Sequence, residues 1–96
     1  MWTTFFDMFS GGEQKTPYSY IFIEAPKETA IQVFETLFKI DPYNITCNCC
    51  GEDFAIYEDE SLETATTYLK KEEKINLKTW LKNDFVKVIY EKEITT

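Results

Sequence analysis

The strongest constraint on the fold is one stretch, residues 18–25, whose apolar side chains alternate between the two sides of an extended chain. The sequence YSYIFIEA places Tyr18, Tyr20 and Phe22 on one side, and Ile21 and Ile23 on the other. Successive side chains of a strand face opposite ways, so this segment is apolar on both faces. Strands of this kind lie in the middle of a sheet, and we therefore predict a central strand over residues 18–25.

An amphipathic helix is predicted directly after this strand. Pro26 stands where the first helical residue is expected, a position that favours proline because an N–H there would lack a partner anyway. Over residues 27–40 the apolar side chains recur with the spacing of one helix face: Ala30, Ile31, Val33, Phe34, Leu37 and Phe38. Asp41-Pro42 ends the helix, because a residue that precedes proline avoids helical angles.

Further strands and helices complete a predicted α+β fold. Residues 2–9, 54–58 and 85–94 have the apolar alternation of strands. Ser61 is a candidate cap for a second helix that would bury Leu62, Ala65 and Leu69, and Asn76 for a short third helix. We expect residues 1–96 to form a single domain. Its predicted architecture is a small mixed or antiparallel sheet of about four strands, with two to three helices on one face.

Composition argues against two classes of function. The net charge is −7, and the 10 basic residues are all lysines. Nucleic-acid binders need a basic surface, usually with arginine, so direct binding of DNA or RNA is not expected. No apolar run reaches the roughly 18 residues needed to span a membrane, and the N-terminal segment lacks the basic start of a signal peptide. We therefore expect a protein of the reducing cytosol, where disulfides are rare.

The most distinctive motif is a cluster of all 3 cysteines, in a chain without histidine: Cys47, Cys49 and Cys50. Cys47 and Cys50 have C-x-x-C spacing and Gly51 follows, as in a zinc knuckle whose thiolates point at one ion. We predict that all three thiols bind a structural Zn²⁺ that staples this turn. Four ligands are needed, and the fourth stays open between Asp53, Asp7, a water molecule and a partner subunit.

Two other interpretations of the cysteines remain open. Buried thiols can serve simply as small apolar residues. Redox chemistry expects C-x-x-C at the start of a helix that follows a strand, whereas a Gly-Glu-Asp turn and a strand follow here. Catalysis has little support, because the chain offers no histidine and no phosphate-binding loop, and thiolate-rich zinc sites are usually closed. We therefore predict that the protein is not an enzyme.

An acidic run without lysine follows the cysteines, and its carboxylates are Glu52, Asp53, Glu58, Asp59, Glu60 and Glu63. Some of these carboxylates can simply lie in a solvated loop. Others would lie at the N-terminus of the second helix, where negative charge is favourable. The remainder would form a negative surface beside the metal turn. Such a surface suits a basic protein partner, and we take the six residues as the predicted partner-binding site.

Three segments together resemble a family of small phage and prophage proteins. They are FFDMFSGG at residues 5–12, YIFIEAPKETAIQVF at residues 20–34 and ITCNCCGEDFAIYEDESLETATTY at residues 45–68. The family pattern combines an aromatic-x-Asp-Met-x-Ser-Gly-Gly start, an IYIEAP-like strand and a TCTCCG turn. The acidic, arginine-free composition is similar to that of proteins from phages of low-GC Gram-positive bacteria.

The resemblance extends to type II-A anti-CRISPR proteins, which inhibit Cas9 and include a zinc-binding member of similar size. It implies a phage-encoded, non-catalytic inhibitor that binds host Cas9 directly and prevents target DNA loading or cleavage. Its location would be the cytoplasm of the bacterial host. The alternative is a small phage protein that acts as a structural or interaction module for another host or virion protein.

Overall fold

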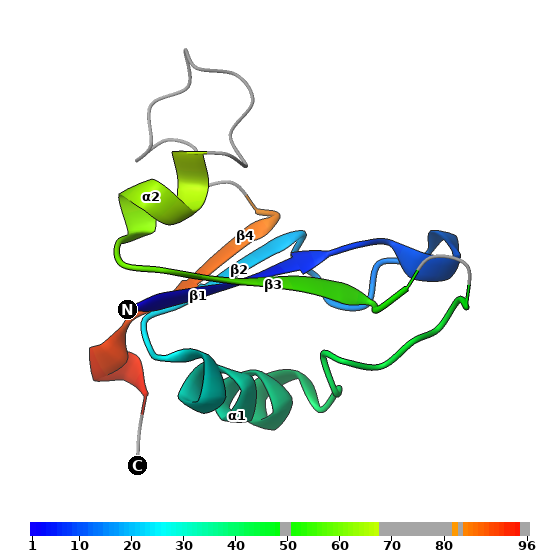
Figure 1. Ribbon diagram of the computed structural model, residues 1–96, viewed down its shortest axis with the longest axis horizontal. Helices are drawn as coiled ribbons and strands as arrows, with labels where there is room; N and C mark the ends of the chain where they lie inside the picture. Colours follow the sequence, from blue (N-terminus) through cyan, green and yellow to red (C-terminus); the bar gives the residue numbers. More distant parts are fainter. Residues whose placement is uncertain (49–50, 68–81, 83, 95–96) are drawn as a thin grey trace.

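The computed structural model describes residues 1–48, 51–67, 82 and 84–94 (Figure 1). Its strands are β1 (Trp2–Asp7), β2 (Tyr20–Ile23), β3 (Phe54–Asp59) and β4 (Val86–Ile89). They form one sheet in the order β3-β1-β2-β4, in which β1 is antiparallel to β2 and β3 while β2 and β4 are parallel. The fold is therefore α+β with a mixed sheet, one of the two sheet types that the sequence predicted.

Strand β2 is central, as its two apolar faces require. On one face Ile21 and Ile23 are fully buried beneath helix α1 (Lys27–Phe38). Phe34 of this helix stacks on Phe5 of β1, with their ring centroids 4.6 Å apart. Helix α1 thus covers the lower face of the sheet in Figure 1 and builds the larger of the two apolar clusters.

The opposite face of the sheet is covered by a second helix, α2 (Leu62–Thr67), which lies above the sheet in Figure 1. Its Ala65 is fully buried in a cluster with Trp2, Phe22 and Val86. The prediction that the helices share one face was wrong. Because β2 is apolar on both sides, a sheet covered on one face would leave Phe22 in water.

The ends of α1 differ slightly from the prediction. Pro26 is the residue before the helix rather than the first helical residue, and it carries no side-chain oxygen that could cap the helix. The N–H of Lys27 is instead satisfied by Glu58 of β3, whose Oε2 accepts it at 2.9 Å. The helix ends at Phe38, earlier than expected, because Lys39 adopts a left-handed conformation with φ of 57°.

The last strand is shorter than predicted. After Ile89 the apolar alternation gives way to charged residues, and Glu91–Glu93 form a short 3-10 helix, η2. The N–H of Glu91 donates to Oε1 of Glu24 at 3.0 Å, which turns the chain away from the sheet. The predicted third helix and Leu69 lie outside the described residues. In the part of the chain that is described, no helix is long and apolar enough to cross a membrane.

Candidate functional site

Asp7 organises the loop that follows β1. Its carboxylate is fully buried and accepts two backbone N–H groups, that of Phe9 on Oδ1 at 2.9 Å and that of Lys15 on Oδ2 at 2.7 Å. Between these donors lies a short 3-10 helix, η1 (Ser10–Gly12), and Phe9 has a left-handed φ of 54°. These bonds turn the chain immediately after Asp7, so the strand ends earlier than the predicted residue 9.

Asp53 has the same role in the neighbouring loop, directly before β3. It is only 1% exposed, and its Oδ1 accepts the N–H of Thr46 at 2.9 Å. Oδ2 accepts the hydroxyl of Thr46 at 2.8 Å and the side-chain amide of Asn44 at 3.2 Å. The backbone N–H of Asp53 also donates to the carbonyl of Asn44 at 2.8 Å. One residue therefore ties the segment before the cysteines to the start of β3.

The surroundings of Asp53 favour its ionised form. Burial by itself raises the pKa of a carboxyl group, because it removes water from the charge. Here the hydrogen bonds from Thr46 and Asn44, together with the positive charge of Lys15, outweigh burial and hold the pKa of Asp53 below its ordinary value. The loop is thus held by a buried carboxylate whose charge is stabilised by local donors.

Cys47, the first residue of the cysteine motif, follows this anchored segment directly. Cys47 and Gly51 face each other across an isolated antiparallel bridge, and Gly51 has a φ of 82°, which suits glycine. Cys47 is half-buried. Cys49 and Cys50, the other two predicted zinc ligands, lie outside the described residues.

Asp7 and Asp53, the two carboxylates that are candidates for a fourth zinc ligand, both hold their surrounding loops in place. Both carboxylate oxygens of Asp7 and of Asp53 accept at least one hydrogen bond from a nearby N–H or O–H group. Among the described residues, no three His, Cys, Asp or Glu side chains are grouped so that they could hold a metal ion. The zinc site stays a prediction, and thiolates are the donors that best fit it.

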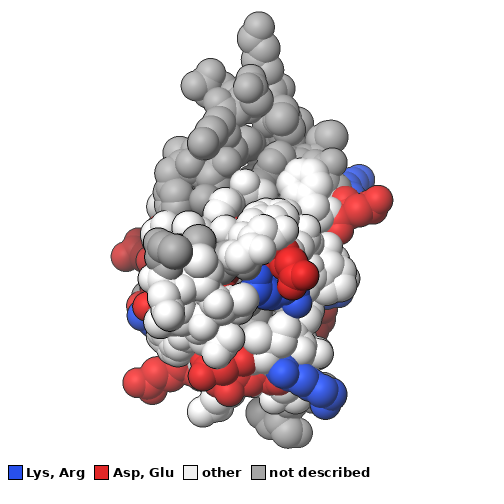
Figure 2. Space-filling model, turned by 90° about the vertical axis from the view of Figure 1, so that its right-hand side faces the viewer, with Lys and Arg blue, Asp and Glu red and all other residues white. Residues whose placement is uncertain are grey.

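The acidic run is divided by the structure. Asp53 is buried, and Glu58 caps α1, while Glu60 and Glu63 are exposed beyond the far end of β3. Glu52 is exposed at the other end of this strand, roughly 25 Å from Glu60 at about 3.3 Å per residue. In the view onto the loop end of the molecule, acidic side chains gather along the lower rim and uncharged ones fill much of the face (Figure 2).

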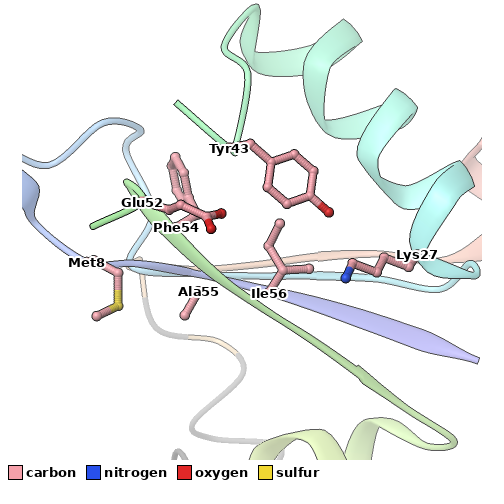
Figure 3. Close-up of a pocket in the computed structure, with 7 residues that line it drawn as sticks. All are labelled: Met8, Lys27, Tyr43, Glu52, Phe54, Ala55 and Ile56. Atoms are coloured by element: carbon pink, nitrogen blue, oxygen red, sulfur yellow. The ribbon is translucent and has the colours of Figure 1, made fainter. Parts of the chain in front are cut away.

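A groove of about 340 Å³ runs beside β3, and its lining residues are Met8, Lys27, Tyr43, Glu52, Phe54, Ala55 and Ile56. Figure 3 shows Phe54, Ile56 and the ring of Tyr43 on one side of the β3 ribbon, with Met8 and Ala55 on the other. The groove therefore follows the outer edge of the strand and is bounded by both of its faces.

The sequence did not single out Lys27, Tyr43 or Met8 as parts of a site. Tyr43 lies in the loop after α1, and its N–H donates to Oδ1 of Asp41 at 2.9 Å, which positions the residue above the edge of β3. A Tyr in a polar loop and a Met at the end of a strand are, by themselves, weak signals of a binding site. Only the position of β3 at the edge of the sheet brings them together.

We compared the chain with models of protein families, with curated proteins and with solved structures. None of the three comparisons gave a match. The arrangement of the chain's own residues is therefore the basis for the functional proposals below, together with the resemblance seen in its sequence.

Proposed function

We propose that this protein is a phage-encoded inhibitor that binds a basic surface of host Cas9 and has no catalytic role. The resemblance of the sequence to type II-A anti-CRISPR proteins suggests the partner. The net charge of −7 supports it physically, because Cas9 holds its guide–target heteroduplex in a positively charged channel. An acidic protein seated on that channel would hinder the loading or cleavage of target DNA, and a structural zinc at the cysteine turn is part of this proposal.

The observation that carries the proposal is the firm placement of exposed acids where β3 leads into α2. Glu58 is bonded to the start of α1, and Ser61 caps α2 by accepting the N–H of Thr64 at 3.1 Å. Glu60 and Glu63 extend from this fixed segment into solvent. Charges that are already held in place lose less entropy on binding, and they speed the encounter with an oppositely charged surface.

The test reverses the charge of two exposed acids, in the variant Glu60→Lys/Glu63→Lys. A matched control, Glu13→Lys/Glu35→Lys, makes the same change of net charge at exposed positions elsewhere. Glu58 is left intact because it caps α1. We expect the first variant to associate with Cas9–guide complex about tenfold more slowly at low salt, and the difference to fade as salt screens the charges.

Two outcomes would overturn the proposal. If purified protein and Cas9–guide complex do not co-elute and DNA cleavage continues at a stoichiometric excess of inhibitor, Cas9 is not the partner. A protein that acts as a virion module would instead self-associate or be retained by virion components. If both variants lose association equally, only the net charge matters and the segment from Glu58 to Glu63 is not the contact surface.

A further inference from the structure

We infer that the outer edge of β3 is a binding site for an extended, basic segment of another protein, which would add to the sheet as a fifth strand. This site lies beside the segment discussed above but differs from it in mechanism, since backbone hydrogen bonds rather than exposed acids provide the contact. It does not depend on Cas9 being the partner.

One hydrogen bond fixes which backbone groups of β3 face outward. The N–H of Met8 donates to the carbonyl of Asp53 at 2.9 Å, and these two residues continue the β1–β3 register by one step. They are therefore a hydrogen-bonded pair, and in an antiparallel ladder such pairs alternate with pairs whose N–H and C=O groups point away. The residues of β3 with outward N–H and C=O groups are Phe54, Ile56 and Glu58.

These outward groups lie along an open edge. In the described part of the chain β1 is the only strand that neighbours β3, and the groove beside Phe54 and Ile56 provides the space that another strand would occupy. Figure 3 shows this groove bounded from both faces of β3, as expected for a channel along a strand edge. Recognition by strand addition uses the backbone for affinity and alternate side chains for specificity.

The side chains around the edge define the sequence pattern of the added strand. On the α1 side the strand would meet Phe54, Ile56 and the exposed ring of Tyr43, which favour apolar residues. On the other side it would meet Ala55 and the exposed ring of Tyr57, over which the stem of a long basic side chain can lie. The preferred ligand is therefore an extended segment in which apolar residues alternate with lysine or arginine.

Charge decides between a basic partner and a second copy of this chain. Among the described residues that line the groove there is one cation, Lys27. The carboxylates along β3 and at its ends are more numerous: Glu52, Glu58, Asp59 and Glu60. Two copies paired antiparallel about Ile56 would place Glu52 opposite Glu60 at both ends. Like charges directly opposite destabilise a strand pair, and each chain carries a net charge of −7. The edge is thus complementary to a basic strand.

The first experiment measures binding of a short blocked peptide of alternating lysine and valine to the intact protein. Two control peptides replace lysine with glutamate, or carry N-methyl groups on alternate backbone amides. We expect the lysine peptide to bind at least about tenfold more tightly than either control, because one control loses charge complementarity and the other loses the backbone donors. Equal binding of the lysine peptide and its N-methylated form would overturn strand addition.

The second measurement follows amide hydrogen exchange of β3 in the unmodified protein. Before peptide is added, the outward amides of Ile56 and Glu58 should exchange much faster than those of Ala55 and Tyr57, which pair with β1, and with peptide at about ten times its Kd they should slow about tenfold. Unchanged exchange of Ile56 and Glu58 on addition of peptide, or protection of these two amides as strong as that of Ala55 and Tyr57 before peptide is added, would overturn the inference. Alternating protection that grows with protein concentration and needs no peptide would show pairing with a second copy instead, which also overturns it.

Discussion

Replacing Asp53 with asparagine should destabilise the protein strongly at neutral pH. The asparagine side chain keeps an oxygen for the N–H of Thr46, but its NH2 group would replace the oxygen that accepts from the side-chain NH2 of Asn44 and the hydroxyl of Thr46, so both of these bonds to a charged acceptor are lost. Hydrogen bonds to a charged group are worth about 1.5–3 kcal/mol, so we expect a loss of about 2–3 kcal/mol. At about 4–8 °C per kcal/mol for a domain of this size, Tm should fall by roughly 10–20 °C.

The difference between wild type and Asp53→Asn should depend on pH. Because the folded pKa of Asp53 lies below its ordinary value, its charge stabilises the fold above the unfolded pKa of about 3.9, and this stability is lost as pH falls through the folded pKa. Urea unfolding from pH 7 to pH 3 should thus show the two proteins converging in acid. The matched variant Glu60→Gln, at an exposed position, should stay within about 0.5 kcal/mol of wild type. A difference that is constant from pH 7 to pH 3 would refute the role of the buried charge.

Two further predictions test the zinc site and the buried threonines of β1. Protein purified without added zinc should carry about one equivalent per chain, and the zinc hypothesis fails if none is found and three thiols titrate in the native fold. Thr4→Val should stabilise the protein by about 1 kcal/mol in urea unfolding, because the buried hydroxyl of Thr4 has no hydrogen-bond partner among the described residues. Its neighbour Thr3 donates to the carbonyl of Ala25 at 2.9 Å, so Thr3→Val should instead cost about 1–2 kcal/mol; equal effects of the two variants would contradict this reasoning.

Features set by local sequence were predicted well. The alternation in residues 18–25 identified a central strand, and helical spacing identified α1, because both signals depend on the period of side chains along the chain. The same alternation should have indicated that both faces of the sheet need cover. The sequence-based prediction nevertheless put the helices on one face, because no local pattern indicates which face of the sheet a distant helix will cover.

Features made by contacts between distant residues could not be predicted in this way. Glu58 was interpreted as part of an acidic surface, but the fold brings its carboxylate to the first N–H of α1. Asp53 was considered as a metal ligand or surface acid, whereas Thr46 and Asn44 enclose it. The groove requires β3 to be an edge strand, and strand order is a property of the whole topology.

The parallel pairing of β2 with β4 has a consequence for how the protein folds. Tyr20 lies opposite Val86, so the partners are separated by most of the chain, and α1, β3 and α2 all fall between them. Bringing such distant segments together costs loop entropy before their contacts can form and compensate for it. This early cost slows folding. During synthesis β2 must wait for residues 86–89 to emerge before its second neighbour is available. Until then, the β2 edge that later pairs with β4 is open to pairing with other chains, and prompt docking of β4 protects against aggregation.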